Sequence, residues 1–436
     1  MGEKNLVKFL KMDIGLQNAF ATNKRASTLS IESDLLEIGK SIIRSNQLIG
    51  YLPMTCVTSS NSDLQRNSEF KRLLLCPKSV PFVWSVCLIF YQIISYAMWP
   101  LFFAKHMYNK LLIDRSTEKI AMTASLVLAA FIILGRHIYG LVGYRKTLKF
   151  WSQFVNLVHK FEGPSGQNHL KSDAFMRIKV CINRVIVENA VVTLLYGTFC
   201  LSTFILNPEE EQCGIAFYYG HMITAMSFKI MACTHIFIEI WMTFPVRVIQ
   251  GLLHILRQEL DDQLILSKDG KLTGKVTLLR ESWIEDYHTI CTLAKLYTHH
   301  FEKGLILEIG YNSVQMLCQI FSTLSLVLSD MVNAAIARCT PIAFSFRSVY
   351  QLANESDKLC QLHKEIYERL CTYHGDLKLN EELKYKIESL LREMTVNDLS
   401  IQPGRYFNLD RKLVTSIMST IITFVIILVQ FRNGDK

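Results

Sequence analysis

The chain has 436 residues, of which 50% are hydrophobic and only 19% are charged. Soluble domains carry about 25% charged residues, so this composition argues against a single water-soluble core. It also argues against intrinsic disorder, which requires low hydrophobicity together with a high net charge. The twelve cysteines form no Cys-x-x-Cys pair and no zinc-ligand spacing, so neither a disulfide framework nor a metal site is indicated.

Seven stretches of the chain are apolar over the roughly 20 residues that a helix needs to cross a bilayer. Residues 79–104 and Leu413–Phe431 carry no charge, and Ile120–Gly143 is interrupted only near one end, by Arg136 and His137. Four weaker stretches, each with a charged residue inside it or at its edge, are Val185–Leu206, Ile215–Pro245, Gly304–Leu328 and Val332–Ala353. The sequence therefore predicts an all-α membrane protein with seven transmembrane helices.

The Lys and Arg residues predict how these helices are oriented. Residues 1–78 are polar and contain no signal peptide, so the first span is expected to act as the insertion signal. With the N-terminus inside, 38 of the 47 Lys and Arg residues fall in cytoplasmic segments and 6 fall in outer ones. The positive-inside rule then predicts a cytoplasmic N-terminus and an extracellular tail, residues 432–436, at the plasma membrane. Because the net charge of +9 lies in loops beside a membrane, it does not indicate a nucleic-acid partner.

Two of the predicted cytoplasmic segments have a helical pattern of their own. Residues 246–303 and 355–395 place apolar residues three and four positions apart, and the second segment is expected to break at Cys371–Asp376. We expect spans four to six to continue as helices beyond the bilayer and to pack into a cytoplasmic bundle. The alternative is that these segments are amphipathic helices lying on anionic lipid.

The last span carries the most specific motif in the chain. Thr423 and Phe424 are followed by five hydrophobic residues and then by Gln430 and Phe431. This segment resembles the insect gustatory receptor signature, in which Tyr stands where this chain has Phe424. The preceding residues 404–413, GRYFNLDRKL, are similar to the lead-in of that family.

The resemblance implies a ligand-gated, non-selective cation channel with no G-protein partner. In that family four subunits surround one pore built from the seventh helix, and the cytoplasmic helices form an anchor domain between subunits. We therefore expect a homotetramer, or a heteromer with related receptors, whose anchor helices are residues 354–412 and whose pore helix is residues 413–431. A G-protein-coupled receptor, which also has seven spans, has the reverse orientation.

Thr423, Ile427 and Gln430 share one face of the last helix, so four copies would stack rings of hydroxyl, aliphatic and amide groups around an axis. We assign Ile427 and Phe431 to the constriction, because rings of large apolar side chains can gate by dewetting. We assign Gln430 to an ion-facing ring, with weak discrimination among cations because the span has no acidic residue. The alternative is that Gln430 reaches the outer interface and the rest of the face contacts lipid.

A ligand pocket is expected in the outer halves of spans one to six, within residues 79–353, where polar and aromatic side chains gather. The candidate residues are Gln92, Tyr96, Trp99, Tyr219, His221, Gln315, Gln319 and Asn333. Amides and aromatic rings suit a small uncharged polyhydroxy tastant such as a sugar, and the lead-in Phe407–Leu413 is similar to that of the sugar-receptor branch. The last span lacks the Thr-Tyr-Glu of that branch, so bitter or other apolar tastants remain the alternative. The aromatic candidates also fit an interfacial belt, and His221 fits a buried bundle histidine.

Other classes of protein have less support in the sequence. A secondary transporter would show inverted repeats and broken helices at matching positions, and no repeat is present. No nucleophile–base pair, phosphate-binding loop or dinucleotide motif indicates an enzyme or a cofactor. Glu308 and Arg347 both fall in the inner halves of spans, where they could pair.

Overall fold

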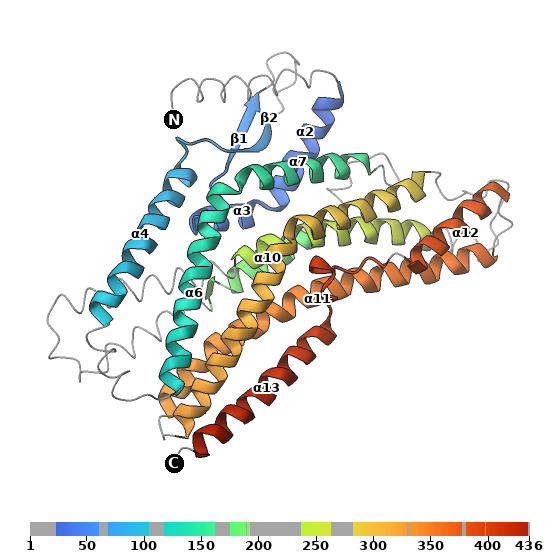
Figure 1. Cartoon of the computed structure of the whole chain (residues 1–436). Helices are drawn as coiled ribbons and strands as arrows, with labels where there is room; N and C mark the ends of the chain where they lie inside the picture. The colour runs from blue at the N-terminus through green and yellow to red at the C-terminus, as the bar shows by residue number, and fades with distance from the viewer. Residues whose placement is uncertain are drawn as a thin grey trace.

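The computed structural model describes most of the chain, in ten segments. These are residues 23–60, 69–103, 117–161, 175–188, 190–191, 237–262, 282–328, 332–376, 381–396 and 398–434. Long helices dominate these segments, and only one small sheet accompanies them (Figure 1).

Three of the seven predicted apolar stretches form helices with nearly the predicted bounds. They are α4 (Val80–Phe103), α6 (Thr117–Val142) and α13 (Arg411–Gly434). Within the described residues, no single helix combines the length and the apolar content of a membrane span, whereas Val127–Val142 and Tyr144–Lys160 do so together across a 65° bend. The predicted stretches Val185–Leu206 and Ile215–Pro245 lie mostly outside the described residues.

The bend after α6 is made at Gly143, where α7 (Tyr144–Lys160) begins. The amide nitrogen of Gly143 donates to the carbonyl oxygen of Tyr139 at 2.6 Å. A Cβ atom added to Gly143 would also lie 2.6 Å from that oxygen, closer than real Cβ atoms come. A residue without a side chain is therefore required for α7 to leave α6 in this direction.

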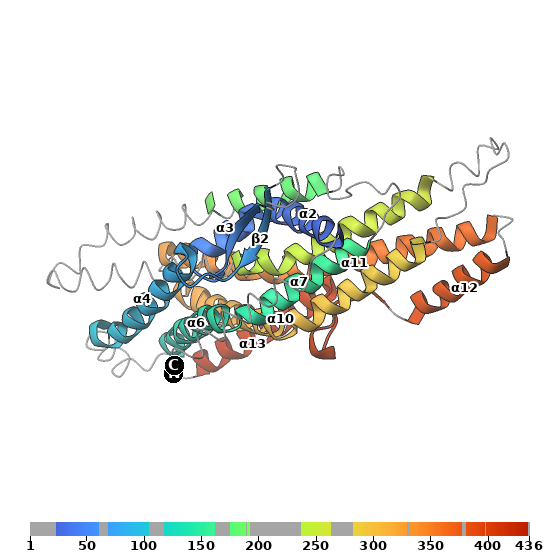
Figure 2. The same ribbon diagram turned by 90° about the horizontal axis from the view of Figure 1, so that it is seen from above.

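The two longest helices extend well beyond the apolar stretches that were predicted as spans five and six. α10 (Ser282–Val327) has 46 residues and α11 (Val332–Asp376) has 45. At 1.5 Å per residue, each helix is roughly 70 Å long. They lie side by side and extend through both halves of the molecule (Figures 1 and 2). α11 also runs through Cys371–Asp376, where the sequence pattern had predicted a break.

A helix formed by residues 237–262 lies at the centre of the core, and every residue from Ile238 to Leu253 in it is buried. The Trp241 ring packs 6.3 Å from the Trp151 ring of α7. On the side of α11, Arg247 lies 3.4 Å from Glu355, and ion pairs join Arg257 to Glu365 and Asp261 to Arg369. The apolar contacts and the ion pairs together fix this helix between α7 and α11.

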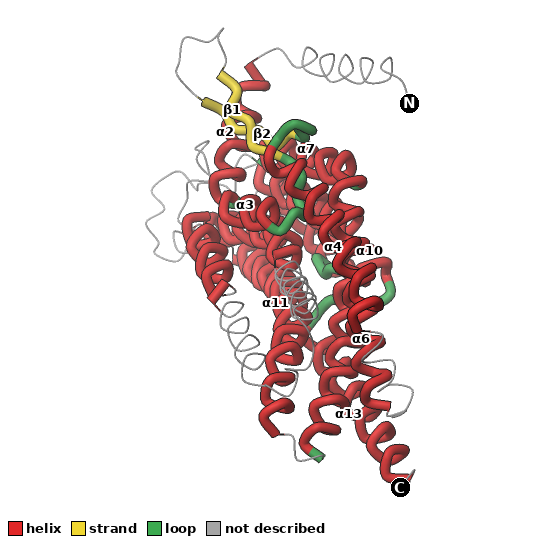
Figure 3. The backbone as a smooth tube through the Cα atoms, turned by 90° about the vertical axis from the view of Figure 1, so that its left-hand side faces the viewer, coloured by secondary structure: helices red, strands yellow, loops and turns green. Residues whose placement is uncertain are grey.

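The N-terminal residues 23–74 add a small layer that the sequence did not predict. α2 (Asn23–Ile38) and α3 (Lys40–Leu48) are followed by an antiparallel pair of strands, β1 (Thr55–Ser60) and β2 (Glu69–Leu74). Thr55 lies opposite Leu74 in this pair, which is found at the end of the molecule remote from the C-terminus (Figure 3). The predicted all-α class therefore needs one correction, because this polar segment folds and includes a hairpin.

The C-terminal residues return the chain to the helical bundle. After α12 (Glu381–Val396), the 3₁₀ turn η4 (Pro403–Arg405) places Gly404 at a φ of 60°. The Asp410 carboxylate accepts a hydrogen bond of 2.9 Å from the Leu413 amide, which caps the N-terminus of α13. Arg411 lies 3.3 Å from Asp357 and donates to the Asn354 side chain at 2.7 Å, so the start of α13 is attached to α11.

We expect Gly143→Ala and Gly135→Ala to change stability in opposite directions. Gly135 lies eight positions earlier in α6, and a Cβ atom there would meet no atom within 4 Å. Alanine in an open helical position is more stable than glycine by roughly 0.5–1 kcal/mol, so Gly135→Ala should raise the midpoint of thermal unfolding in detergent. Gly143→Ala should lower it, and an equal rise in both variants would contradict the requirement for glycine at the bend.

Candidate functional site

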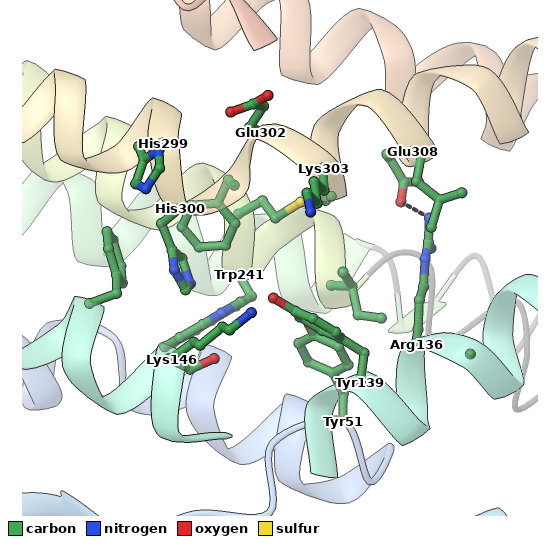
Figure 4. A pocket seen from close by; sticks show the side chains of 18 of the residues that line it. Tyr51, Arg136, Tyr139, Lys146, Trp241, His299, His300, Glu302, Lys303 and Glu308 are labelled. Carbon is green, nitrogen blue, oxygen red and sulfur yellow. Dashed lines mark ion pairs between the residues drawn. The ribbon is translucent and has the colours of Figure 1, made fainter. Parts of the chain in front are cut away.

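A cavity of about 1020 Å³ lies between α6, α7, the helix 237–262 and α10 (Figure 4). We call it the inner cavity, because the predicted orientation puts it on the cytoplasmic side of spans two and five. Its buried apolar and aromatic lining consists of Phe150, Ile238, Trp241, Met242 and Phe301. The exposed side chains that also line it show that it is not closed to the surroundings.

One end of the inner cavity is formed by a buried ion pair. Arg136 of α6 pairs with Glu308 of α10, and both side chains are almost fully buried. The Arg136 guanidinium carbon also lies 5.9 Å from the centre of the Tyr311 ring. The Glu308 carboxylate accepts hydrogen bonds from Asn312 at 2.7 Å and from Ser348 of α11 at 3.3 Å. A single carboxylate therefore connects α6, α10 and α11.

The structure identifies Arg136, and not Arg347, as the ion-pair partner of Glu308. Arg347 lies 3.8 Å from Glu188, and Glu308 pairs with Arg136. The pairing of Glu308 with Arg347 is therefore wrong. The physical reason is that the end of α6 brings Arg136 against α10 just before the bend at Gly143, a contact that sequence spacing does not reveal.

The other end of the inner cavity is basic. Lys146 and Lys149 come from α7 and Lys303 comes from α10, and all three side chains are exposed. His300 stacks on Phe150 with ring centres 4.3 Å apart. Burial, together with His299 and Lys146, lowers the pKa of His300 to about 4, so this ring is neutral at neutral pH. The positive charge of this end therefore comes from the lysines.

A second candidate site is one face of α13. Val414, Ile421 and Val425 are buried against the rest of the subunit. Thr423 and Gln430 lie on the opposite side of the helix and are exposed, as a helical repeat of 3.6 residues requires. The Thr423 hydroxyl donates to the Ser419 carbonyl oxygen at 2.9 Å.

The predicted pore face is therefore a face that α13 turns away from its own subunit. Ile427, which is 38% exposed, belongs to the same face. Phe431 is in the described part of the helix, but its side chain lies outside the description.

The predicted ligand residues form three groups: those that are buried, those with only their backbone described, and those outside the described residues. Gln92 of α4 and Gln315 and Gln319 of α10 are buried, as expected for pocket residues in a bundle. Within the described part of the chain, neither amide atom of Gln92 has a hydrogen-bond partner. The remaining candidates cannot be placed by their side chains: Tyr96, Trp99 and Asn333 have only their helical backbone described, and Tyr219 and His221 lie outside the described residues.

The predicted ligand residues whose side chains are described, Gln92, Gln315 and Gln319, do not line the inner cavity. The sequence reasoning missed the residues that do line it. Arg136 and Glu308 gave the one available signal, since each is a charged residue within an apolar stretch. The lysines gave none, because they lie in segments that are rich in charge throughout.

We expect Glu308→Gln to destabilise the fold strongly. The amide keeps the shape of the carboxylate but leaves Arg136 buried without its counter-ion, and breaking a buried pair costs about 3–5 kcal/mol. The matched control is Glu388→Gln, which breaks the exposed pair of Glu388 with Arg392, 2.8 Å apart on the surface of α12. Surface pairs contribute little, so this variant should unfold at the wild-type temperature. Equal unfolding temperatures for both variants would exclude a structural role for the buried pair.

Comparison with known proteins places this architecture in a family. Residues 40–433 match the family model described as 7tm Chemosensory receptor. The insect olfactory receptor OR5 from Machilis hrabei has a similar structure, with a TM-score of 0.62 and 13% sequence identity over 91% of this chain and 98% of the receptor. The same receptor in complex with eugenol gives a TM-score of 0.63 and 11% identity over 91% of this chain and 100% of the receptor. None of the curated proteins matches this chain.

The family match extends over far more than half of the chain, and the olfactory receptor supports the same fold. Membership of a seven-transmembrane receptor family makes this chain a membrane receptor and not an enzyme. The chain belongs to the 7tm chemosensory receptor family.

Proposed function

We propose that this chain is a gustatory receptor that acts as a ligand-gated, non-selective cation channel in the plasma membrane. One observation carries the proposal: α13 buries an apolar face against its own subunit and exposes a face with Thr423 and Gln430. A lone helix in lipid is expected to do the reverse, because polar side chains are costly in hydrocarbon. Membership of a chemosensory receptor family makes an aqueous pore the environment that fits this face best.

The proposed assembly is a homotetramer, or a heteromer with related receptors, in which each subunit crosses the membrane seven times. The N-terminus is cytoplasmic, and residues 354–412 supply the anchor between subunits. The long helices support this division, since α10 and α11 continue well beyond their apolar stretches. Permeating cations and membrane lipids are the expected partners besides the tastant.

The proposed pore has a simple chemistry. Four copies of α13 would place hydroxyl groups of Thr423, aliphatic groups of Ile427 and amides of Gln430 at successive depths. The aliphatic ring would close the path by excluding water, and the amide oxygens would replace part of the hydration shell of a cation. Since α13 contains no acidic residue, the channel should distinguish poorly among cations.

The proposed agonist is a small polar tastant such as a sugar. Gln92 on α4 and Gln315 and Gln319 on α10 are buried amides, which suits hydrogen bonding to hydroxyl groups. A bitter or other apolar tastant is the second candidate. It is favoured by the similarity to an olfactory receptor whose structure was solved in complex with eugenol.

The first experiment is expression of this chain alone in a cell line, with sugars and bitter compounds applied under voltage clamp. We expect an agonist to evoke a cation current that persists when G proteins are blocked. Sugars are expected to be effective at lower concentrations than bitter compounds. A current that disappears with G-protein block would rule out the channel.

The second experiment tests which face of α13 lines the pore. In the Thr423→Cys variant, a charged, membrane-impermeant thiol reagent should reach the new cysteine from the pore and reduce the current. Phe424→Cys is the matched control, because Phe424 is 52% exposed at nearly the same depth but is rotated by about 100° around the helix. We expect no change of current in that variant. Block of the control and not of Thr423→Cys would contradict the assignment of the face.

A further inference from the structure

The basic end of the inner cavity carries more positive charge than its surroundings neutralise. Arg136 and Glu308 compensate each other as a pair. The lining also holds three lysines, Lys146, Lys149 and Lys303. Among its described residues, Glu302 is the one further carboxylate. The cavity is therefore electropositive, and an anionic ligand would be attracted to it.

The cavity also has an apolar side that reaches the surface. Phe131 of α6 is 71% exposed and Leu307 of α10 is 44% exposed, and both line the cavity. These two residues belong to apolar stretches, whereas the three lysines come from the polar segments that follow α6 and precede span five. The cavity therefore has an apolar side toward the apolar stretches and a basic side toward the polar segments.

Hydrogen-bond donors face the space between these two sides. Figure 4 shows Lys146 and Tyr139 extending into the cavity from α7 and α6, with Tyr51 and Trp241 behind them. Burial raises the pKa of Tyr51 to about 12, so its hydroxyl keeps its proton and can donate. Ammonium and phenol groups together are suitable donors for the oxygens of a phosphate ester.

We propose that the inner cavity binds a membrane lipid with a phosphorylated headgroup, with the phosphates at the lysines and the acyl chains against Phe131 and Leu307. The inference rests on the proposed insertion, which puts α7 and the first half of α10 on the cytoplasmic side. Basic pockets between transmembrane helices on that side are suited to anionic lipid headgroups. The apolar side favours a lipid over a soluble phosphate compound, because a soluble compound would leave Phe131 and Leu307 uncovered.

The test measures binding to the full-length chain in detergent, by native mass spectrometry. The three probes are dioctanoyl phosphatidylinositol 4,5-bisphosphate, inositol 1,4,5-trisphosphate, which has the same headgroup without acyl chains, and dioctanoyl phosphatidylcholine. We expect the first probe to bind most tightly, the second to bind more weakly and the third not to compete. Equal binding of the first two would overturn the lipid assignment in favour of a soluble phosphate ligand.

The variant that tests the site is Lys146→Gln combined with Lys303→Gln. Each lysine near an anionic surface contributes about fivefold in affinity, so the double variant should bind the phosphoinositide about 25-fold more weakly. The control is Lys160→Gln combined with Lys384→Gln, which removes two exposed lysines outside the cavity, on α7 and α12. Wild-type affinity in the first variant, or an equal loss in the control, would overturn the proposal.

The experiment distinguishes a loss of lipid binding from a loss of folding and from a loss of channel activity. All four substituted lysines are exposed, and the unfolding temperature of each variant is measured beside its affinity. Because binding is measured without current, a chain that binds the lipid but does not conduct would contradict only the proposed channel. A chain that conducts but does not bind the lipid would contradict only this inference.

Discussion

The buried ion pair between Arg136 and Glu308 connects α6 to α10, and the hydrogen bonds of Glu308 extend this connection to α11. Each charge loses its hydration in the core, a cost that is repaid only when the partner and further hydrogen bonds are in place. Asn312 and Ser348 supply those bonds to Glu308, so the requirement extends from α6 to α10 and α11. Arg136 lies in α6 shortly before the bend at Gly143, and both residues of the pair line the inner cavity.

The long helices α10 and α11 also support α13, which carries the candidate pore face. Arg411 attaches the start of α13 to Asn354 and Asp357 of α11, and Val414, Ile421 and Val425 pack its apolar side inward. The opposite side, with Thr423 and Gln430, faces away from the subunit. The fold that carries this face is shared with an insect olfactory receptor, and the chain belongs to the 7tm chemosensory receptor family.

Composition alone predicted the elements that depend on a continuous apolar run. α4 was predicted within one residue at each end, because no charge interrupts residues 79–104. The continuation of α10 and α11 as helices beyond their apolar stretches was also predicted, from apolar residues three and four positions apart.

The elements that depend on tertiary contacts were not predictable in this way. The hairpin of β1 and β2 comes from short polar segments that are stabilised by pairing with each other. The partner of Glu308 and the inner cavity depend on residues from four separate segments of the chain. One sequence gives no information on their proximity, and the predicted ligand residues whose side chains are described are not among the cavity residues.

The continuity of α10 has a mechanical consequence. Gln319 near one end and Trp283 at the other belong to one helix without a described interruption, and α11 runs beside it for a similar length. A tilt imposed on one end of this helix pair would displace its other end sideways. Salt bridges from the helix 237–262 to α11 would resist that swing, and their strength would set how much force is needed to produce it.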